Sequence, residues 1–366
     1  MKKIILIAIV LLSSYLLKAQ FECFTQFDDS LNNSRMSSSN YVYDPNGPVK
    51  TIRVNFHFLL RTDGTGNFTE TSDNYSARPY NGYLYAEETV KGCNQYWNGN
   101  PPLRHMPNPP VPNLPKKIQL QLCGVFFHRS TTDYDKDLCH TAASLTFKEN
   151  SGEVINIYII KHIGGGCSGY CSSEQVFIGS AYNNYKQSVD SNNTWYNSST
   201  YKLINHELGH SFSLPHTIKD CCKSYEPDPT PNCDDGIADT PTFDELVALG
   251  YLPCPWNHPL SSNNVMDYCA DQNSLSPMQI SRMHACIDGG KLFYRNCKFK
   301  THSLSITNFT TNKAYIAKYV TIPSTSNIVV GNNSALYINA EEVTIDGPFE
   351  VQLGSILSIE TVPLCD

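Results

Sequence analysis

The stretch HELGHSFSLPH, residues 206–216, decides the fold of this chain. It places three of the chain's eleven histidines and one glutamate within a single short segment. His206 and His210 are four residues apart, so they share one face if residues 200–212 form a helix. The spacing therefore predicts two imidazoles that point to the same place from adjacent turns.

Apolar residues support this helix. Ile204, Leu208 and Phe212 also recur every four residues, and their stripe lies on the side away from the histidines. Either Ser199 or Thr200 is a suitable residue to cap the start of the helix. A helix that buries one side and presents two histidines on the other is the arrangement that a zinc ion requires.

A third histidine completes the candidate metal site. His216 becomes a ligand if the chain turns sharply after Phe212, and Pro215 favours an extended approach to it. Glu207 lies beside the two helical histidines, where its carboxylate can act as a general base on a water molecule. The alternative is that these are ordinary polar residues of a solvated helix. The fixed register of four residues favours the metal site.

The N-terminal residues predict export of the chain. Residues 1–20, MKKIILIAIVLLSSYLLKAQ, have the layout of a secretory signal peptide, with two lysines before a short apolar run. Removing it takes three lysines from a chain of net charge −7 and leaves −10. A mildly acidic secreted chain argues against nucleic acid as a partner. No later apolar run is long enough to predict membrane insertion of the mature chain.

The cysteine count fits an oxidising compartment. All 14 cysteines follow the signal peptide, and an even count predicts disulfide bonds, up to seven in number. Cys23 has a second interpretation, in which its thiolate blocks zinc in a latent form. We prefer the disulfide, because an even count favours full pairing.

The rest of the chain divides into three further segments. Residues 21–50 are polar and predict a leader or prosegment. Residues 51–298 hold the main domain, with strands at 51–60, 118–127 and 154–160, a helix at 85–97, a loop rich in glycine and cysteine at 164–173, and a short strand at 176–179. A last helix is predicted to start at Ser276–Pro277, with Gln279 completing a capping box, and to end at Gly289. Residues 299–366 alternate short β segments with Asn and Gly, which predicts a small all-β module of stacked turns.

These motifs together carry a resemblance. HELGHSFSLPH resembles the long zinc motif of the metzincin metallopeptidases, and NNVMDY at 263–268 resembles their Met-turn, whose methionine lies beneath the metal. The pair His216-Thr217 resembles the pappalysin-type family, as do CDDGIADTP at 233–241 and PMQISRM at 277–283. The resemblance implies an α+β metzincin-like catalytic domain. It has a twisted mixed sheet, an active-site helix and an irregular lower subdomain that ends in a helix.

The same resemblance implies the roles of individual residues. It implies that His206, His210 and His216 bind zinc, that Glu207 is the catalytic base and that Met266 forms the floor of the site. Tyr268 is then placed to hydrogen-bond the substrate carbonyl or its oxyanion. It also implies structural calcium at Asp234, Asp235 and Asp239, for which a solvated acidic turn is the alternative.

One position departs from the family pattern. The family has glycine where this chain has Ser213, at the end of the active-site helix. A serine would be strained by about 1–2 kcal/mol in the left-handed conformation that glycine takes, so His216 is the ligand that depends most on the fold.

The expected function is that of a secreted zinc endopeptidase (hydrolase) acting on protein or peptide substrates. The alternative, which Ser213 favours, is a catalytically weak zinc-containing binding or adhesion protein that uses the β module. A zinc hydrolase of non-peptide bonds is disfavoured by the metzincin resemblance. The oligomeric state does not follow from the sequence.

Overall fold

A computed structural model gives the fold. It describes residues 22–23, 41–70, 80–107, 109–136, 147, 149–150, 152–161, 167–172, 174–192, 195–217, 234–248, 262–267, 271–289, 301–305 and 307–361. Within these residues, no helix has the length and apolar character that a membrane crossing requires.

The first layer is a mixed sheet of six strands in the order β1-β5-β6-β4-β2-β3. The strands are β1 (Glu22–Cys23), β2 (Lys50–Leu60), β3 (Ile118–Arg129), β4 (Ile155–Ile159), β5 (Cys167–Ser172) and β6 (Gln175–Ile178). All neighbouring pairs are parallel except β5 with β6. The predicted strands β2, β3, β4 and β6 are confirmed, with ends that differ by one or two residues.

The glycine- and cysteine-rich segment differs from its prediction. It was expected to be a loop, but residues 167–172 form β5, which pairs antiparallel with β6. The small residues of this segment show no clear alternation of apolar and polar side chains, so its sequence does not predict a strand. Its pairing with β6 shows that it is one. Consequently β6 is an interior strand, and β5 separates it from the two-residue strand β1 at the edge.

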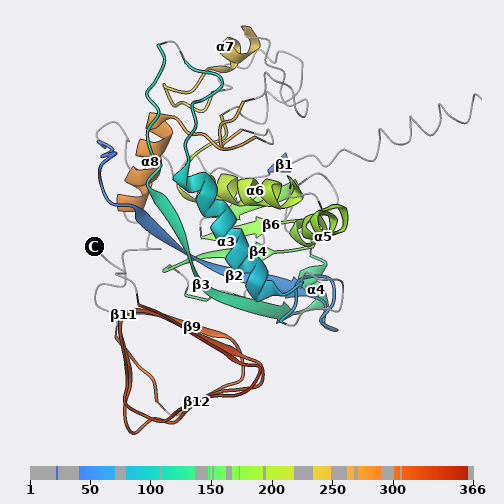
Figure 1. The fold of residues 1–366 in the computed structure, drawn as a ribbon. Coiled ribbons are helices and arrows are strands. Elements are labelled where there is room, and N and C mark those ends of the chain that lie inside the picture. The colour runs from blue at the N-terminus through green and yellow to red at the C-terminus, as the bar shows by residue number, and fades with distance from the viewer. Residues whose placement is uncertain are drawn as a thin grey trace, which may run out of the picture.

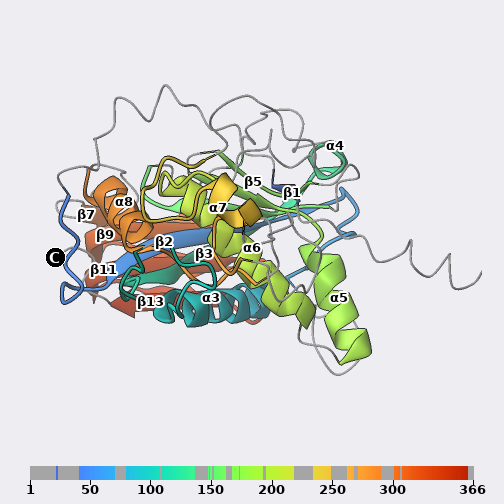
Figure 2. The same ribbon diagram turned by 90° about the horizontal axis from the view of Figure 1, so that it is seen from above.

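Helices cover one face of the sheet. Helix α3 (Gly82–Asn98) contacts β3, and α6 (Trp195–Ser211) contacts β5 and β6, with α5 (Ala181–Ser191) beside it (Figures 1 and 2). The shared core includes Phe56, Phe58, Trp97, Leu208 and Phe212. Helix α6 starts five residues before the predicted 200. Short helices α4 (Thr131–Tyr134) and α7 (Phe243–Ala248) lie in the connections.

Helix α8 (Pro277–Asp288) confirms the predicted start signal. The Ser276 hydroxyl accepts from the backbone of Gln279, the Gln279 side chain accepts from the backbone of Ser276, and proline occupies the first turn. Gly289 follows the last residue of the helix.

Residues 301–361 form a β-solenoid, a coil of short parallel strands that looks triangular from its end (Figure 1). Strands β7 (Thr301–Ser303), β9 (Lys313–Ile322), β11 (Ala335–Ile345) and β13 (Ile356–Thr361) form one parallel sheet, and β8 (Thr307–Phe309), β10 (Ile328–Val330) and β12 (Phe349–Val351) form another. Its own apolar core includes Phe309, Val320 and Ile338. The boundary at residue 299, like the leader at 21–50, stays a prediction.

The solenoid lies beyond β3, the edge strand of the sheet, and contacts it through β9 and β11 (Figure 1). The burial of β2 differs from its prediction. Alternating polar residues predicted a strand buried on one side only, but Arg53, Asn55 and His57 are as buried as the apolar positions between them. The sequence of β2 does not reveal that its second face is also covered.

Candidate metal centre

Helix α6 ends in a Schellman motif that redirects the chain toward the third histidine. The backbone N–H of Ser213 donates to His210 (2.9 Å), and that of Leu214 donates to Gly209 (3.0 Å). Ser213 has φ +69°, the left-handed conformation that favours glycine. The sharp turn expected after Phe212 is therefore present, with serine in place of glycine.

The turn brings the three histidines together. The Nε2 atoms of His206 and His216 are 3.1 Å apart, those of His210 and His216 are 3.0 Å apart, and those of His206 and His210 are 3.2 Å apart. All three side chains are buried. Among the described residues, they are the one group of three or more His, Cys, Asp or Glu side chains gathered closely enough to hold a metal ion.

Backbone carbonyls fix which nitrogen faces the site. The Nδ1 atom of His206 lies 2.7 Å from the carbonyl oxygen of Val265, and that of His210 lies 2.8 Å from the carbonyl oxygen of Leu214. A carbonyl can only accept, so each Nδ1 carries the proton and each Nε2 presents a lone pair. Burial, and then the nearby His206, lower the pKa of His210 well below its usual value, which keeps the ring neutral.

This donor set fits zinc. Zinc holds histidine nitrogens at about 2.0–2.1 Å in a tetrahedron, whose edges are then about 3.3 Å long. The observed separations of 3.0–3.2 Å are close to that edge. Three converging lone pairs repel one another unless a cation lies between them, so the arrangement itself favours a bound metal.

Met266 packs directly against Gly209 of helix α6. Its side chain is fully buried, and its Sδ would be 2.3 Å from a Cβ placed on Gly209. The glycine within HELGH is therefore required by the methionine that packs against it. The backbone N–H of Thr217 donates to the carbonyl of Met266 (3.1 Å), which joins the chain after His216 to the Met-turn.

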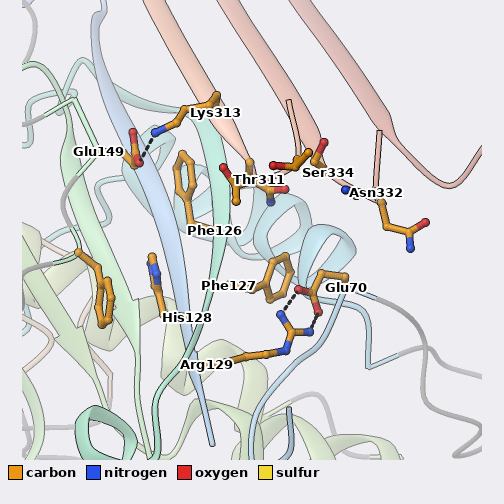
Figure 3. Close-up of a pocket in the computed structure, with 14 residues that line it drawn as sticks. Glu70, Phe126, Phe127, His128, Arg129, Glu149, Thr311, Lys313, Asn332 and Ser334 are labelled. Carbon is orange, nitrogen blue, oxygen red and sulfur yellow. Dashed lines mark hydrogen bonds and ion pairs between the residues drawn. The ribbon is translucent and has the colours of Figure 1, made fainter. Parts of the chain in front are cut away.

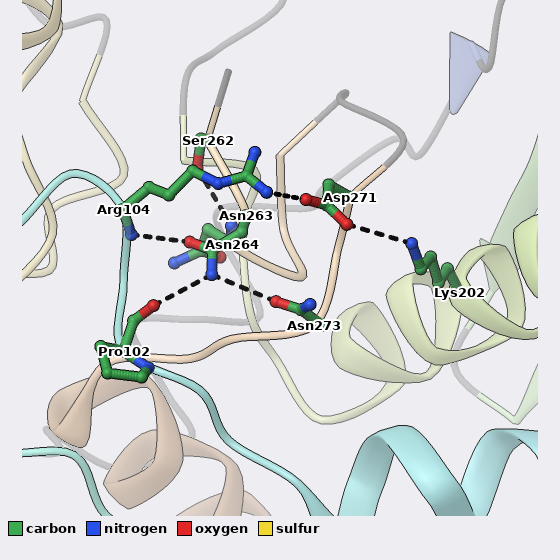
Figure 4. A network of polar contacts seen from close by, with 8 residues as sticks. All are labelled: Pro102, Arg104, Lys202, Ser262, Asn263, Asn264, Asp271 and Asn273. Atoms are coloured by element: carbon green, nitrogen blue, oxygen red, sulfur yellow. Dashed lines mark hydrogen bonds and ion pairs between the residues drawn. The ribbon is translucent and has the colours of Figure 1, made fainter. Parts of the chain in front are cut away.

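A polar network holds the Met-turn loop in place (Figure 4). The Asn263 carboxamide donates to Pro102 and Asn273 and accepts from the backbone of Arg104. Asp271 pairs with Arg104 and, at 3.3 Å, with Lys202 of α6. The network links the loop after α3, the Met-turn loop and the active-site helix. The sequence does not reveal this network, because its members come from three distant segments.

Gly169 also has a role in the site that the sequence does not reveal. A Cβ on this residue of β5 would lie 2.3 Å from Oε1 of Glu207. The Glu207 side chain is fully buried, so β5 forms one wall of the space that its carboxylate occupies. A glycine in a glycine-rich segment gives no sign of this role until β5 is placed beside α6.

The acidic loop gives no support to calcium. Asp239 accepts from the Ser276 hydroxyl (2.5 Å) and from the backbone of Met278 (2.7 Å), so its two oxygens hold the start of α8. Asp235 accepts from the backbone of Ile237 and from the Thr240 hydroxyl within its own turn. Asp234, Asp235 and Asp239 do not form a metal-binding group within the described residues. Tyr268 lies outside the described residues, so its role stays a prediction.

Full pairing of the cysteines is not observed. Cys93, Cys123 and Cys286 are free thiols, the first two buried in α3 and β3. An even count says nothing about which thiols the fold brings together. Most other cysteines lie outside the described residues.

A helix with HExxH, a third histidine beyond a left-handed turn and a methionine floor define a metallopeptidase type of site. Comparison with protein families supports this class: the model of the peptidase M43 family described as pregnancy-associated plasma protein-A matches residues 150–288. The resemblance to the pappalysin family, a metzincin group, is thereby confirmed for this part of the chain. No match is found among curated proteins.

Proposed function

We propose that this protein is a secreted zinc endopeptidase that hydrolyses peptide bonds of protein substrates. The observation that carries the proposal is the triangle of three Nε2 atoms, 3.0–3.2 Å apart, on the helix that also holds Glu207. The family match over these residues supports the same conclusion. Secretion rests on residues 1–20 and is checked by sequencing the N-terminus of the exported protein.

His206, His210 and His216 would hold the zinc. When bound, zinc would polarise the scissile carbonyl and lower the pKa of a bound water from that of bulk water to about 7. The Glu207 carboxylate takes a proton from the attacking water and delivers it to the leaving nitrogen. Its buried position against β5 keeps bulk water away and restricts the directions in which it can point.

The edge of β5 is the proposed substrate-binding strand. An extended peptide could pair with this edge by backbone hydrogen bonds, which would bring many sequences past Glu207. In the structure β1 of the leader pairs with the same edge, with Cys23 opposite Gly169. We therefore propose that the leader leaves this edge before a substrate binds.

The test is cleavage of casein by the chain beginning at residue 41, with and without 1,10-phenanthroline. Cleavage should stop with the chelator and return with added zinc. Glu207→Ala should lower kcat/KM by at least about 100-fold while one equivalent of zinc stays bound. The full-length chain should be slower than the shortened one if the leader covers the β5 edge.

The same assay separates the alternative. Intact casein with one equivalent of bound zinc in the wild-type chain would support a binding or adhesion protein and contradict the peptidase. Ser213 favoured that alternative, but its left-handed conformation delivers His216 to the site. The peptidase is therefore the better supported function.

A further inference from the structure

A cavity of about 490 Å³ lies between the six-stranded sheet and the solenoid (Figure 3). Its lining residues do not include His206, His210 or His216. Its walls come from the end of β3 (residues 126–129), from Phe147 and Glu149, and from two solenoid turns at 310–313 and 332–334. This volume lies within the range of ligand pockets, and such pockets form preferentially where two structural units meet.

The charged groups of the cavity are already paired. Arg129 makes a two-pronged ion pair with Glu70, with N–O distances of 2.7 and 2.8 Å, and Lys313 pairs with Glu149 at 3.1 Å. These four are the charged residues of the described lining, and their charges sum to zero. A charged ligand would have to break one of these pairs, so the cavity favours a neutral ligand.

The solenoid side supplies hydroxyl and carboxamide groups. Thr311 and Asn332 are exposed side chains, and within the described part of the chain neither side chain has a hydrogen-bond partner. Asn332 and Asn333 have φ of +55° and +54°, so they form a tight turn, and Asn332 lines the cavity. Hydroxyl and carboxamide groups both donate and accept, which matches a ligand that carries several hydroxyl groups.

The sheet side supplies aromatic rings. Phe126 and Phe127 come from β3, and the ring of Phe147 stacks on His128 with centroids 4.2 Å apart. Burial lowers the pKa of His128 to about 4, so this ring is uncharged at neutral pH. Aromatic faces carry negative potential and attract the weakly positive C–H groups that line one face of a sugar ring.

We infer that this cavity binds a neutral carbohydrate, with its C–H face against the half-buried ring of Phe147 and its hydroxyls toward Thr311 and Asn332. A purely apolar ligand would displace water from the polar wall without replacing its hydrogen bonds, and an ionic one would have to compete with the two ion pairs. The inference does not rest on the peptidase activity, because none of the lining residues belongs to the histidine site.

The test measures binding of four neutral trisaccharides by saturation-transfer NMR and calorimetry: maltotriose, cellotriose, mannotriose and tri-N-acetylchitotriose. The protein is the Glu207→Ala full chain, which should not degrade itself. At least one trisaccharide should bind. Thr311→Ala/Asn332→Gly should weaken that binding at least about tenfold, as expected for two lost hydrogen bonds. Glycine is used at 332 because it accepts the positive φ.

Two further variants show whether a loss of binding comes from the cavity or from a general effect on the protein. Thr325→Ala/Asn327→Gly makes the same changes at exposed solenoid residues outside the cavity and should bind like the parent. Phe147→Leu keeps an apolar side chain but removes the ring, and it should weaken binding while thermal unfolding shows that the fold is retained. Absence of binding to all four sugars, or binding that survives both cavity variants, would overturn the inference. Preference for a charged trisaccharide such as tri-galacturonate would also overturn it.

Discussion

Ser213 has an unfavourable backbone conformation, and this conformation turns the chain toward His216. Its φ of +69° costs a serine about 1–2 kcal/mol relative to glycine. Its hydroxyl lies 3.2 Å from the thiol of Cys286 on α8, which provides one local contact in return. The candidate metal site thus depends on a strained residue that neighbouring structure holds in place.

Ser213→Gly should raise the free energy of unfolding by about 1 kcal/mol, because the strain disappears but glycine loses more chain entropy on folding. Urea unfolding of the zinc-free protein measures it. Ser213→Ala is the matched control, since it removes the hydroxyl and keeps the Cβ. If alanine stabilised the protein as much as glycine, the strain would not lie in the backbone.

Gly169→Ala should lower kcat/KM by at least about tenfold, because its Cβ would displace the Glu207 carboxylate. Zinc content, measured by elemental analysis, should stay at one equivalent because no histidine moves. Gly99→Ala is the control, since a Cβ there meets its nearest neighbour at an ordinary 3.6 Å. Unchanged activity in Gly169→Ala would mean that Glu207 is not held by β5.

At the scale of elements, the central strand β2 carries a buried polar group between β3 and β4. His57 contacts His128 of β3 (2.8 Å) and Asn156 of β4 (2.7 Å), and its ring stacks between Phe126 and Tyr158. Burial, and then the nearby His128, lower the pKa of His57 to about 3. Burial also lowers the pKa of His128 to about 4.

These two histidines predict acid sensitivity. In the unfolded chain each takes up a proton below about pH 6.5, whereas in the folded chain each stays neutral until the pH approaches its lowered pKa. The contribution of these neutral histidines to the free energy of unfolding is therefore complete above about pH 6.5, and it falls by several kcal/mol as the pH drops toward about 4.

His57→Gln should make this loss smaller, because one titrating group is gone. Urea unfolding at pH 7 and at pH 4.5 measures the difference for each protein. His105→Gln, in the loop after α3, is the control and should keep the wild-type pH dependence. Equal losses in the wild type and His57→Gln would refute the assignment.

At the scale of the whole molecule, the solenoid is joined to the catalytic sheet by specific bonds. Asn312 donates to the hydroxyl of Tyr83 on α3 (3.2 Å) and to the carbonyl of Val125 on β3 (2.6 Å), and it accepts from the backbone of Ala335 (2.8 Å). Asn339 adds a bond to the carbonyl of Cys123. One carboxamide therefore connects a helix, a strand and two solenoid turns.

Asn312→Ala should loosen this junction and destabilise the protein by about 2 kcal/mol, because three hydrogen bonds are lost in a half-buried place. Hydrogen exchange should become faster in residues 118–129 and in the solenoid turn near Asn312. Asn308→Ala, an exposed asparagine on β8, is the control. Unchanged exchange in β3 would show that the junction does not depend on Asn312.

The sequence by itself determined the features of this protein that arise from residues close together along the chain. The register of His206, Glu207 and His210, the capping box of α8 and the alternation of β2 and β3 follow from helix and strand geometry. These features are set within about one or two turns of chain, so a reading of the sequence can find them.

Only the tertiary structure decided which distant segments meet. It set Gly169 against Glu207, Met266 against Gly209 and the solenoid against β3, and it left Cys93 and Cys123 apart as buried thiols. It also converted a glycine-rich loop into β5 and buried the polar face of β2. Each of these depends on contacts across a core, which spacing along one chain does not encode.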